Sequence, residues 1–217
     1  MYSSQDLIRR AELFPSLHIT LNLLVNEFSL IPMERKRTLS ELTQFVKKKV
    51  EANQKACLNF ICTHNSRRSH VAQIWAKTAA HYFNTPNVEC FSGGVETTAF
   101  NQRAVKAMRD VGFDIAKIKE GDNPVYEVRF SSDAAPIISF SKKYDDSFNP
   151  NKDFAAIMTC AHADENCPLV LGASVRIAIT YDDPKDFDGT NQEEAKYKER
   201  VDQIGREILY AFSQVKL

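Results

Sequence analysis

From residue 56 onward, short apolar runs alternate with longer amphipathic segments, and this alternation constrains the fold most. Four runs have the length and composition of buried strands: Cys57–Cys62, Val88–Phe91, Phe154–Thr159 and Ser174–Ile179. Amphipathic helices are expected at Ser69–Phe83, Asn101–Val111 and Glu193–Phe212. Strands that alternate with helices form an open, mostly parallel sheet with helices on both faces. We therefore predict an α/β protein with a four-stranded sheet.

Residues 1–53 fall outside this alternation and are expected to be helical. A short amphipathic segment ends at Pro15, and a second is capped by Ser16 and runs to Phe28. A third begins near Thr38–Glu41, which has the form of a capping box. We predict a helical extension over 1–53.

Residues 54–217 are expected to form the main domain, with an insertion near 121–150. Within this insertion, Val125–Phe130 and Pro136–Phe140 are typical of a hairpin. Lys142–Lys152 is expected to be an exposed loop.

Charge and hydropathy exclude several classes of protein. Lys plus Arg and Asp plus Glu are both 28, so the formal net charge is zero and a generally basic nucleic-acid binder is not expected. No apolar run has the length needed to span a membrane, and the first residues lack the basic start of a signal peptide.

Five cysteines indicate a reducing compartment, because the number is odd and low for 217 residues. A secreted disulfide framework is therefore not expected, and we predict a cytoplasmic protein. Cys57 and Cys90 lie in apolar strands and are expected in the core.

The segment from Cys62 to Ser69 carries the strongest chemical signal. A buried strand ends in Cys62, five residues follow, and then come Arg68, Ser69 and a helix. A short loop between a strand and a helix N-terminus turns backbone N–H groups toward one point, where a tetrahedral oxyanion can bind. Arg68 can add a bidentate contact, and the positive surroundings favour the thiolate form of Cys62. Ser69 can donate a hydrogen bond to the sulfur.

A cysteine and an arginine at this spacing also occur without any shared role, as a buried strand residue and a surface residue. The strand, the polar loop, the helix and the following serine favour the anion site. Its predicted oxyanion-binding residues are Thr63, His64, Asn65, Ser66, Arg67, Arg68 and Ser69.

Residues Cys62–Ser69 resemble the phosphate-binding loop of the low-molecular-weight protein tyrosine phosphatase superfamily. They are closer still to the thioredoxin-coupled arsenate reductases built on that fold, some of which share the Cys-x-His-Asn form seen here. The resemblance continues in Phe91–Glu96, Asn101–Met108 and Gly112–Ile115. It covers about residues 55–115 and 152–215, and it leaves 1–53 and the region near 121–145 without a counterpart.

Cys160 and Cys167 match a cysteine pair that is typical of these reductases and not of the phosphatases. The resemblance implies a relay in which Cys62 attacks arsenate and Cys160 attacks Cys62 as arsenite leaves. Cys167 then attacks Cys160, and a thioredoxin-like reductant reduces the resulting disulfide. The alternatives are a structural pair, or a metal site if His162 and another residue join.

Asp183, within Tyr181-Asp182-Asp183-Pro184, resembles the Asp-Pro that lies over the anion in both groups. In the phosphatases this aspartate is the general acid for the leaving oxygen, which is poor when unprotonated. An Asp-Pro after a strand is also an ordinary turn.

Some positions depart from the family pattern. Arg67 stands where the reductases often have cysteine, and it adds positive charge near the anion. In some reductases a helix glutamate and the loop asparagine bind potassium, but here Gln73 stands at the glutamate position although Asn65 is present, so a potassium site is not expected. We predict no metal and no other cofactor. His70 and His81 are expected on the helix surface.

The sequence favours arsenate reduction, and two alternatives remain open. Arsenate reduction uses the full relay, with Cys62, Arg68, Cys160, Cys167 and Asp183 as catalytic residues. Phosphate-ester hydrolysis, on phosphotyrosine for example, needs only Cys62, Arg68 and Asp183. A phosphate-sensing scaffold would use the N-terminal helices as its partner surface, and a homodimer would form through the same helices.

Overall fold

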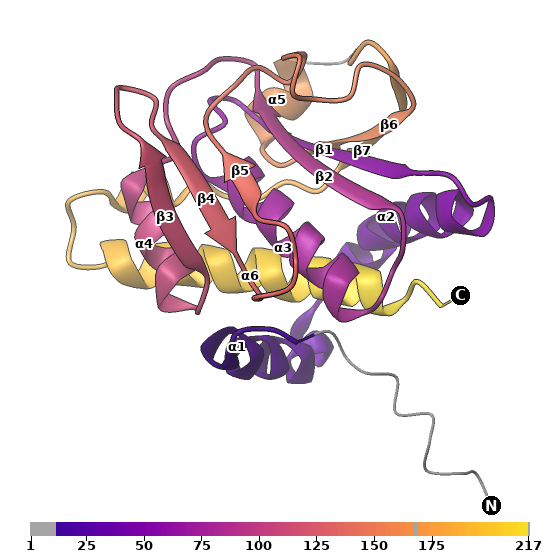
Figure 1. The fold of residues 1–217 in the computed structure, drawn as a ribbon, viewed down its shortest axis with the longest axis horizontal. Coiled ribbons are helices and arrows are strands. Elements are labelled where there is room, and N and C mark those ends of the chain that lie inside the picture. The colour runs from indigo at the N-terminus through magenta and orange to yellow at the C-terminus, as the bar shows by residue number, and fades with distance from the viewer. Residues whose placement is uncertain (1–11, 167–168, 217) are drawn as a thin grey trace, which may run out of the picture.

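A computed structural model describes residues 12–166 and 169–216, and at its centre lies a parallel sheet (Figure 1). The strands stand in the order β2-β1-β6-β7, and every neighbouring pair is parallel. Their bounds are β1 Ala56–Cys62, β2 Val88–Gly94, β6 Phe154–Met158 and β7 Ala173–Ala178. The predicted four-stranded parallel sheet is confirmed, although β2 runs on through the two glycines at which it was expected to end.

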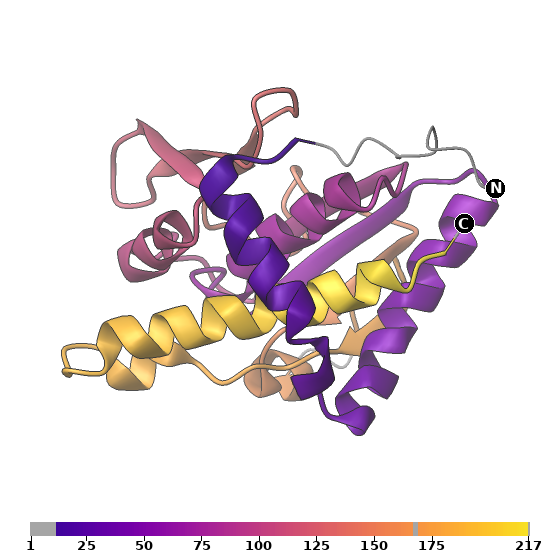
Figure 2. The same ribbon diagram turned by 90° about the horizontal axis from the view of Figure 1, so that it is seen from below.

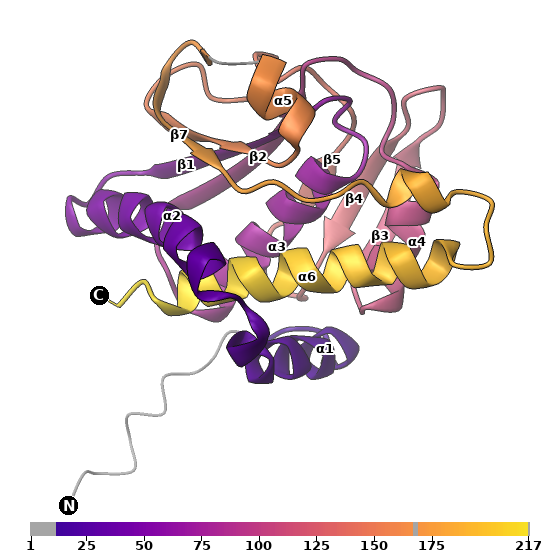
Figure 3. The ribbon, with the colours of Figure 1, turned by 180° about the vertical axis from the view of Figure 1, so that it is seen from behind.

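Helices cover both faces of this sheet, as predicted. Helices α3 (Arg68–Tyr82), α6 (Glu193–Ser213) and α2 (Met33–Glu51) lie on one face, and α5 (Ala161–Asn166) lies on the other (Figures 1 and 3). Helix α4 (Gln102–Asp110) packs beside α6.

The side chains of β1 point alternately to the two faces of the sheet, and both faces are buried, which explains the continuous apolar run in this strand. Leu58 and Phe60 belong to the large core cluster under the helices, whereas Ile61 belongs to a smaller cluster on the face of α5. All three are fully buried. A strand buried on both faces has no solvent-exposed side on which polar residues would be favoured.

A second, antiparallel sheet stands beside the first, in the order β3-β4-β5. The predicted hairpin is present as β4 (Val125–Arg129) and β5 (Ile137–Ser139). Strand β3 (Asp114–Lys119) was not predicted, because only Ile115 of its six residues is buried and its sequence lacks an apolar signal.

The predicted exposed loop at 142–152 is wrong at two positions. Lys142 and Asn149 are buried, because this segment runs along the free edge of β2. The N–H of Gly94 donates to the Lys142 carbonyl at 2.9 Å, and the N–H of Tyr144 donates to the Gly94 carbonyl at 2.9 Å. The segment thus becomes part of the sheet edge.

Three segments form the N-terminal region: α1 (Pro15–Asn26), the short helix η1 (Phe28–Leu30) and α2. The predicted helix starts are wrong, since α1 begins at Pro15 and α2 at Met33 rather than near Thr38. Pro32 precedes α2 and fixes its start, because a proline is favoured where no N–H partner is required. The amphipathic residues expected before residue 12 lie outside the described residues.

Helix α1 crosses over α6 on the side away from the sheet (Figure 2). Gly205 of α6 makes this close approach possible. A Cβ atom at Gly205 would lie 2.6 Å from the Trp75 ring of α3 and 2.9 Å from Leu24 Cδ1 of α1. Leu17, Leu21 and Leu24 of α1 are buried in the same cluster as the helical face of the sheet.

Within residues 12–166 and 169–216, no helix has the length and apolar character required to cross a membrane.

Candidate active site

The loop that follows β1 is held from outside through its carbonyl groups. Four of its carbonyl oxygens accept hydrogen bonds from the segments at 95–101 and 141. The donors are Val95 N to Cys62 O (3.2 Å), Glu96 N to Thr63 O (2.8 Å), Ser141 Oγ to His64 O (3.0 Å) and Asn101 N to Ser66 O (2.9 Å). Because the carbonyls point outward, the N–H groups of the same loop face the opposite side.

Those N–H groups are the ones from which the sequence predicts an anion nest, and they are left available for a ligand. In the described part of the chain, no backbone N–H of residues 63–68 donates a hydrogen bond to a protein acceptor. Asn65 adopts the left-handed backbone conformation with φ 43°. Its side chain fixes that conformation, because Oδ1 accepts from Lys142 N at 2.9 Å and Nδ2 donates to Ser69 Oγ at 2.9 Å.

Cys62 lies at the base of the loop, almost fully buried. Its Sγ is 3.1 Å from Ser69 Oγ, so the contact that the sequence predicts is present. Ser69 is itself held by Asn65, and the sulfur is therefore placed by the first turn of α3.

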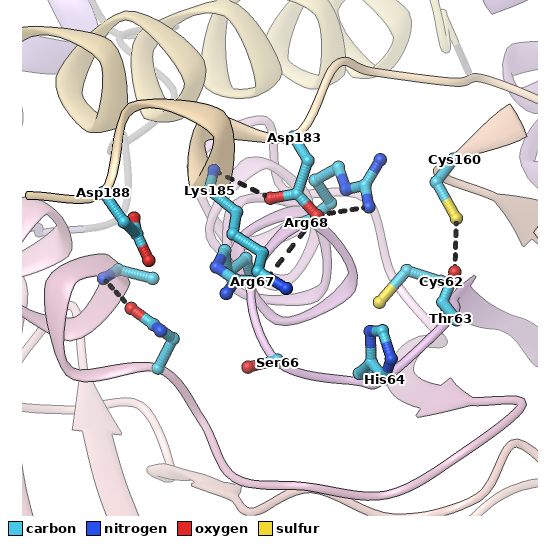
Figure 4. Close-up of polar contacts among 12 residues, drawn as sticks. Cys62, Thr63, His64, Ser66, Arg67, Arg68, Cys160, Asp183, Lys185 and Asp188 are labelled. Atoms are coloured by element: carbon cyan, nitrogen blue, oxygen red, sulfur yellow. Dashed lines mark hydrogen bonds and ion pairs between the residues drawn. The ribbon is translucent and has the colours of Figure 1, made fainter. Parts of the chain in front are cut away.

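Arg68 and Asp183 are in direct contact at the site (Figure 4). Arg68 Nη2 donates to Asp183 Oδ2 at 2.6 Å, and Nη1 donates to the Tyr181 carbonyl at 2.9 Å. The buried Arg68 Nε has no hydrogen-bond partner among the described residues. Arg67 also approaches Asp183, at 3.6 Å, while its Nε donates to the Tyr197 hydroxyl at 3.1 Å.

The neighbouring strand brings a second cysteine to the same edge of the sheet. β6 pairs with β1, and Thr159 N donates to Ile61 O at 2.7 Å just before Cys160. The buried Cys160 Sγ lies 3.4 Å from Thr63 Oγ1, next to Cys62 (Figure 4). The same hydroxyl is 3.2 Å from His162 Nδ1. Cys167 lies outside the described residues.

His70 is a residue that the sequence analysis placed wrongly on the surface. Its ring is fully buried, stacks on Phe100 at 4.2 Å and lies 3.3 Å from Ser92 Oγ through Nδ1. Burial, together with the charge of Lys142, holds the pKa of His70 well below its usual value. His81, also expected on the surface, is half-buried and packs against Phe130.

Lys142 is a site residue that the sequence analysis missed. It supports Asn65 through its backbone N–H, and only 5% of its surface is exposed. Burial lowers the pKa of its ammonium group to about 8. A lysine in a polar segment gives no sequence signal of burial.

Among residues 12–166 and 169–216, no group of three or more His, Cys, Asp or Glu side chains is placed to hold a metal ion. The donors gathered around Cys62 are instead backbone N–H groups, hydroxyls and guanidinium groups, which suit an oxyanion.

Comparison with curated proteins supplies the family. An arsenate reductase of Bacillus licheniformis is 34% identical over 155 residues, which cover 71% of this chain and 93% of that protein. The chain belongs to the arsenate reductase family. An arsenate reductase of Bacillus subtilis strain 168 is 31% identical over 150 residues, covering 69% of this chain and 89% of its own. These relatives confirm the family resemblance drawn from the sequence. No protein-family model matches the chain.

Solved structures resemble this family member more distantly. A low-molecular-weight phosphotyrosine phosphatase of Vibrio cholerae O395 covers 73% of this chain and 94% of its own, with 12% identity and a TM-score of 0.47. The match to a thioredoxin-dependent arsenate reductase of Corynebacterium glutamicum covers 90% of this chain and 98% of that protein, with 17% identity and a TM-score of 0.41. The family assignment rests on the curated relatives and not on these likenesses.

Proposed function

We propose that this protein reduces arsenate to arsenite by a cysteine relay that starts at Cys62. Membership in the arsenate reductase family supports the reaction. The observation that carries the relay is the position of Cys160, a second buried cysteine that contacts Thr63 beside the nucleophile. A phosphate-ester hydrolase has no use for a second thiol at this place.

In the first step, the Cys62 thiolate attacks the arsenic of bound arsenate. An S–As bond forms and one arsenate oxygen leaves as water after protonation. Asp183 is the proposed proton donor, because its carboxyl group is held beside the loop by Arg68 and Arg67. The loop N–H groups and Arg68 Nε are the donors proposed for the remaining oxygens.

In the second step, the Cys160 thiolate attacks Cys62 Sγ. The S–As bond breaks, its electron pair stays with arsenic, and arsenite leaves as a Cys62–Cys160 disulfide forms. Cys167 then attacks Cys160, which frees Cys62 and leaves a Cys160–Cys167 disulfide. A thioredoxin-like dithiol reduces this disulfide, and the cycle needs the reducing conditions expected of the cytoplasm.

A helix that ran on from Cys160 to Cys167 would hold the two cysteines too far apart for the last exchange. Residues Ala161–Asn166 between the two cysteines are helical, and seven residues of helix span about 10 Å. A disulfide needs Cα atoms within roughly 7 Å. We therefore propose that α5 unwinds when Cys160 passes from Cys62 to Cys167.

A single turnover tests the relay. Arsenate is added to the reduced protein without thioredoxin, and the disulfides are mapped by peptide mass spectrometry. A Cys160–Cys167 link should accumulate, and Cys167→Ala should give a Cys62–Cys160 link instead. Cys57→Ala is the matched control, since Cys57 is a half-buried strand cysteine on β1 away from the loop, and it should not alter the links.

Arsenate that leaves every thiol free would contradict the relay. So would a Cys62→Ser variant that still forms arsenite, because the first S–As bond could not then be made.

A second function, phosphate-ester hydrolysis, is favoured by one observation. A cavity of about 560 Å³ opens beside the loop at His64, Ser66 and Arg67, with Lys117 and Lys185 at its sides. It extends beyond the space that a bare oxyanion fills, so it could hold the organic part of an ester.

Parallel assays with arsenate and an aryl phosphate separate the two functions. If hydrolysis is the activity, Asp183→Asn should slow hydrolysis most for poor leaving groups, which need protonation most. An equal loss for good and poor leaving groups would contradict Asp183 as the acid.

A further inference from the structure

The side chain of Arg35, in the N-terminal helix α2, contacts the segment that leads from β7 to Asp183. We propose that Arg35 is a positioning residue for oxyanion binding: it holds the segment 180–183, and that segment holds Arg68. The inference deepens the proposed function, because it supposes that Arg68 binds the oxyanion substrate.

Arg35 joins three parts of the fold. Its Nε donates to Glu207 Oε2 of α6 at 2.8 Å, and its Nη2 donates to the Thr180 carbonyl at 3.0 Å. Its guanidinium carbon also lies 4.8 Å from the centre of the Tyr181 ring. The guanidinium group therefore fixes both the backbone and a side chain of the segment that follows β7.

This segment is the only link between Arg35 and Arg68 that the described contacts provide. Arg68 donates to the Tyr181 carbonyl and to Asp183, so two of its three donor groups are oriented by residues directly after Thr180. Residues 180 and 181 are thus bound to Arg35 on one side and to Arg68 on the other. Moving them would change the direction of the Arg68 side chain.

Glu207 makes the Arg35 position specific. Its carboxylate is buried, and the second oxygen accepts from Gln203 Nε2 at 3.1 Å. A flat guanidinium group can reach a carboxylate and a carbonyl in one plane, whereas an ammonium group is a point charge without this geometry. The site therefore needs arginine and not only a positive charge.

Arg35→Lys tests the inference by keeping the charge and removing the planar fork. Its affinity for inorganic phosphate, measured by calorimetric titration, should fall roughly two- to tenfold, the range expected when one hydrogen bond is lost. The KM for arsenate should rise by a similar factor with kcat nearly unchanged, because Arg68 contacts the anion before and during the reaction. Hydrogen exchange in the peptide over 180–187 should become faster.

Arg206→Lys is the matched control. Arg206 also joins α6 to the N-terminal region, through Glu27 at 2.9 Å, but it does not contact residues 180–183. It should leave phosphate affinity, KM and exchange unchanged. A merely structural role for Arg35 would give both variants the same small change in melting temperature and no change in affinity.

A second, double variant tests the inference without leaving an unpaired buried charge that could unfold the protein. Arg35→Met combined with Glu207→Gln removes both charges, so that neither is left buried and unpaired. It should show the same loss of phosphate affinity. Wild-type affinity in Arg35→Lys or in this double variant would overturn the inference. Phosphate binding by the wild type without arsenate reduction would contradict the relay alone, since phosphate affinity does not depend on the thiols.

Discussion

Lys142 ties the stability of the folded protein to pH. Its N–H supports Asn65, while its ammonium group lies against the Phe140 ring at 4.7 Å and is almost removed from water. Burial lowers its pKa from 10.5 to about 8. The folded protein thus holds this proton less tightly than the unfolded chain does. The cost of burial is full below about pH 8 and is relieved as the pH rises toward 10.5.

Lys142→Met should therefore raise the free energy of unfolding at pH 7, by an amount on the order of 3 kcal/mol, because 2.5 pKa units correspond to about that energy. The gain over wild type should shrink between pH 8 and 10. Urea unfolding at pH 7 and pH 9.5 measures both values.

Lys143→Met is the control, since Lys143 is exposed and its removal should change the stability little at either pH. An equal gain at both pH values for Lys142→Met would show that the charge is not the cause.

The residues of the nest could be predicted from the sequence because their relation is local. Cys62, Arg68 and Ser69 are neighbours along one strand–loop–helix unit, so their spacing alone places them together. Lys142 and Arg35 could not be predicted, because the burial of Lys142 and the contacts of the half-buried Arg35 both come from segments far away in the chain. Each stands in a polar stretch that is equally compatible with the surface.

Elements were predictable where the pattern of buried residues was strong. The central strands β1 and β6 are almost completely buried, and their continuous apolar runs show it. The outer strands β2 and β7 are only partly buried, but each still carries a short apolar run. Strand β3 exposes most of its residues and is formed by pairing with β4, which no local pattern reveals. The start of α2 was missed because the capping-box pattern at Thr38 competes with Pro32, and the proline decides the start.

Gly205 determines how closely helices α1, α3 and α6 pack. Gly205→Ala gains about 1 kcal/mol of helix propensity. The added Cβ, however, would lie 2.6 Å from Trp75, which is fully buried and has no room to move. Overpacking of this kind costs roughly 1–3 kcal/mol, so the variant should be less stable than wild type in urea unfolding.

Combining Leu24→Ala with Gly205→Ala gives a double-mutant cycle, since Leu24 Cδ1 is the second close neighbour of a Cβ atom at position 205. The double variant should lose less than the sum of the single losses, because trimming Leu24 makes space for the new methyl group. A more stable Gly205→Ala protein would contradict the close packing.

At the scale of the whole molecule, the N-terminal helices and the main sheet share one buried cluster. We therefore expect one cooperative transition in scanning calorimetry. Leu21→Ala in α1 should cost roughly 2–5 kcal/mol and lower the melting temperature of the entire transition by about 5–15 °C.

If the loop binds phosphate as proposed, phosphate should raise the melting temperature of that same transition, since a ligand that binds only the folded state stabilises it. A separate early transition in the Leu21→Ala protein would instead show that the segment 1–53 unfolds as an independent unit.

The hydrogen bonds that hold the loop carbonyls from outside affect how the proposed enzyme would discriminate between arsenate and the far more abundant phosphate. A loop whose carbonyls are fixed by neighbouring segments has little freedom to adjust to the small difference in size between arsenate and phosphate, so both anions should bind to it. Phosphate would then be a dead-end ligand for the reductase, since thiols reduce arsenic(V) to arsenic(III) but do not reduce phosphorus(V) to phosphorus(III). Selectivity on this scheme arises from reactivity after binding, and the turnover rate would depend on the ratio of the two anions.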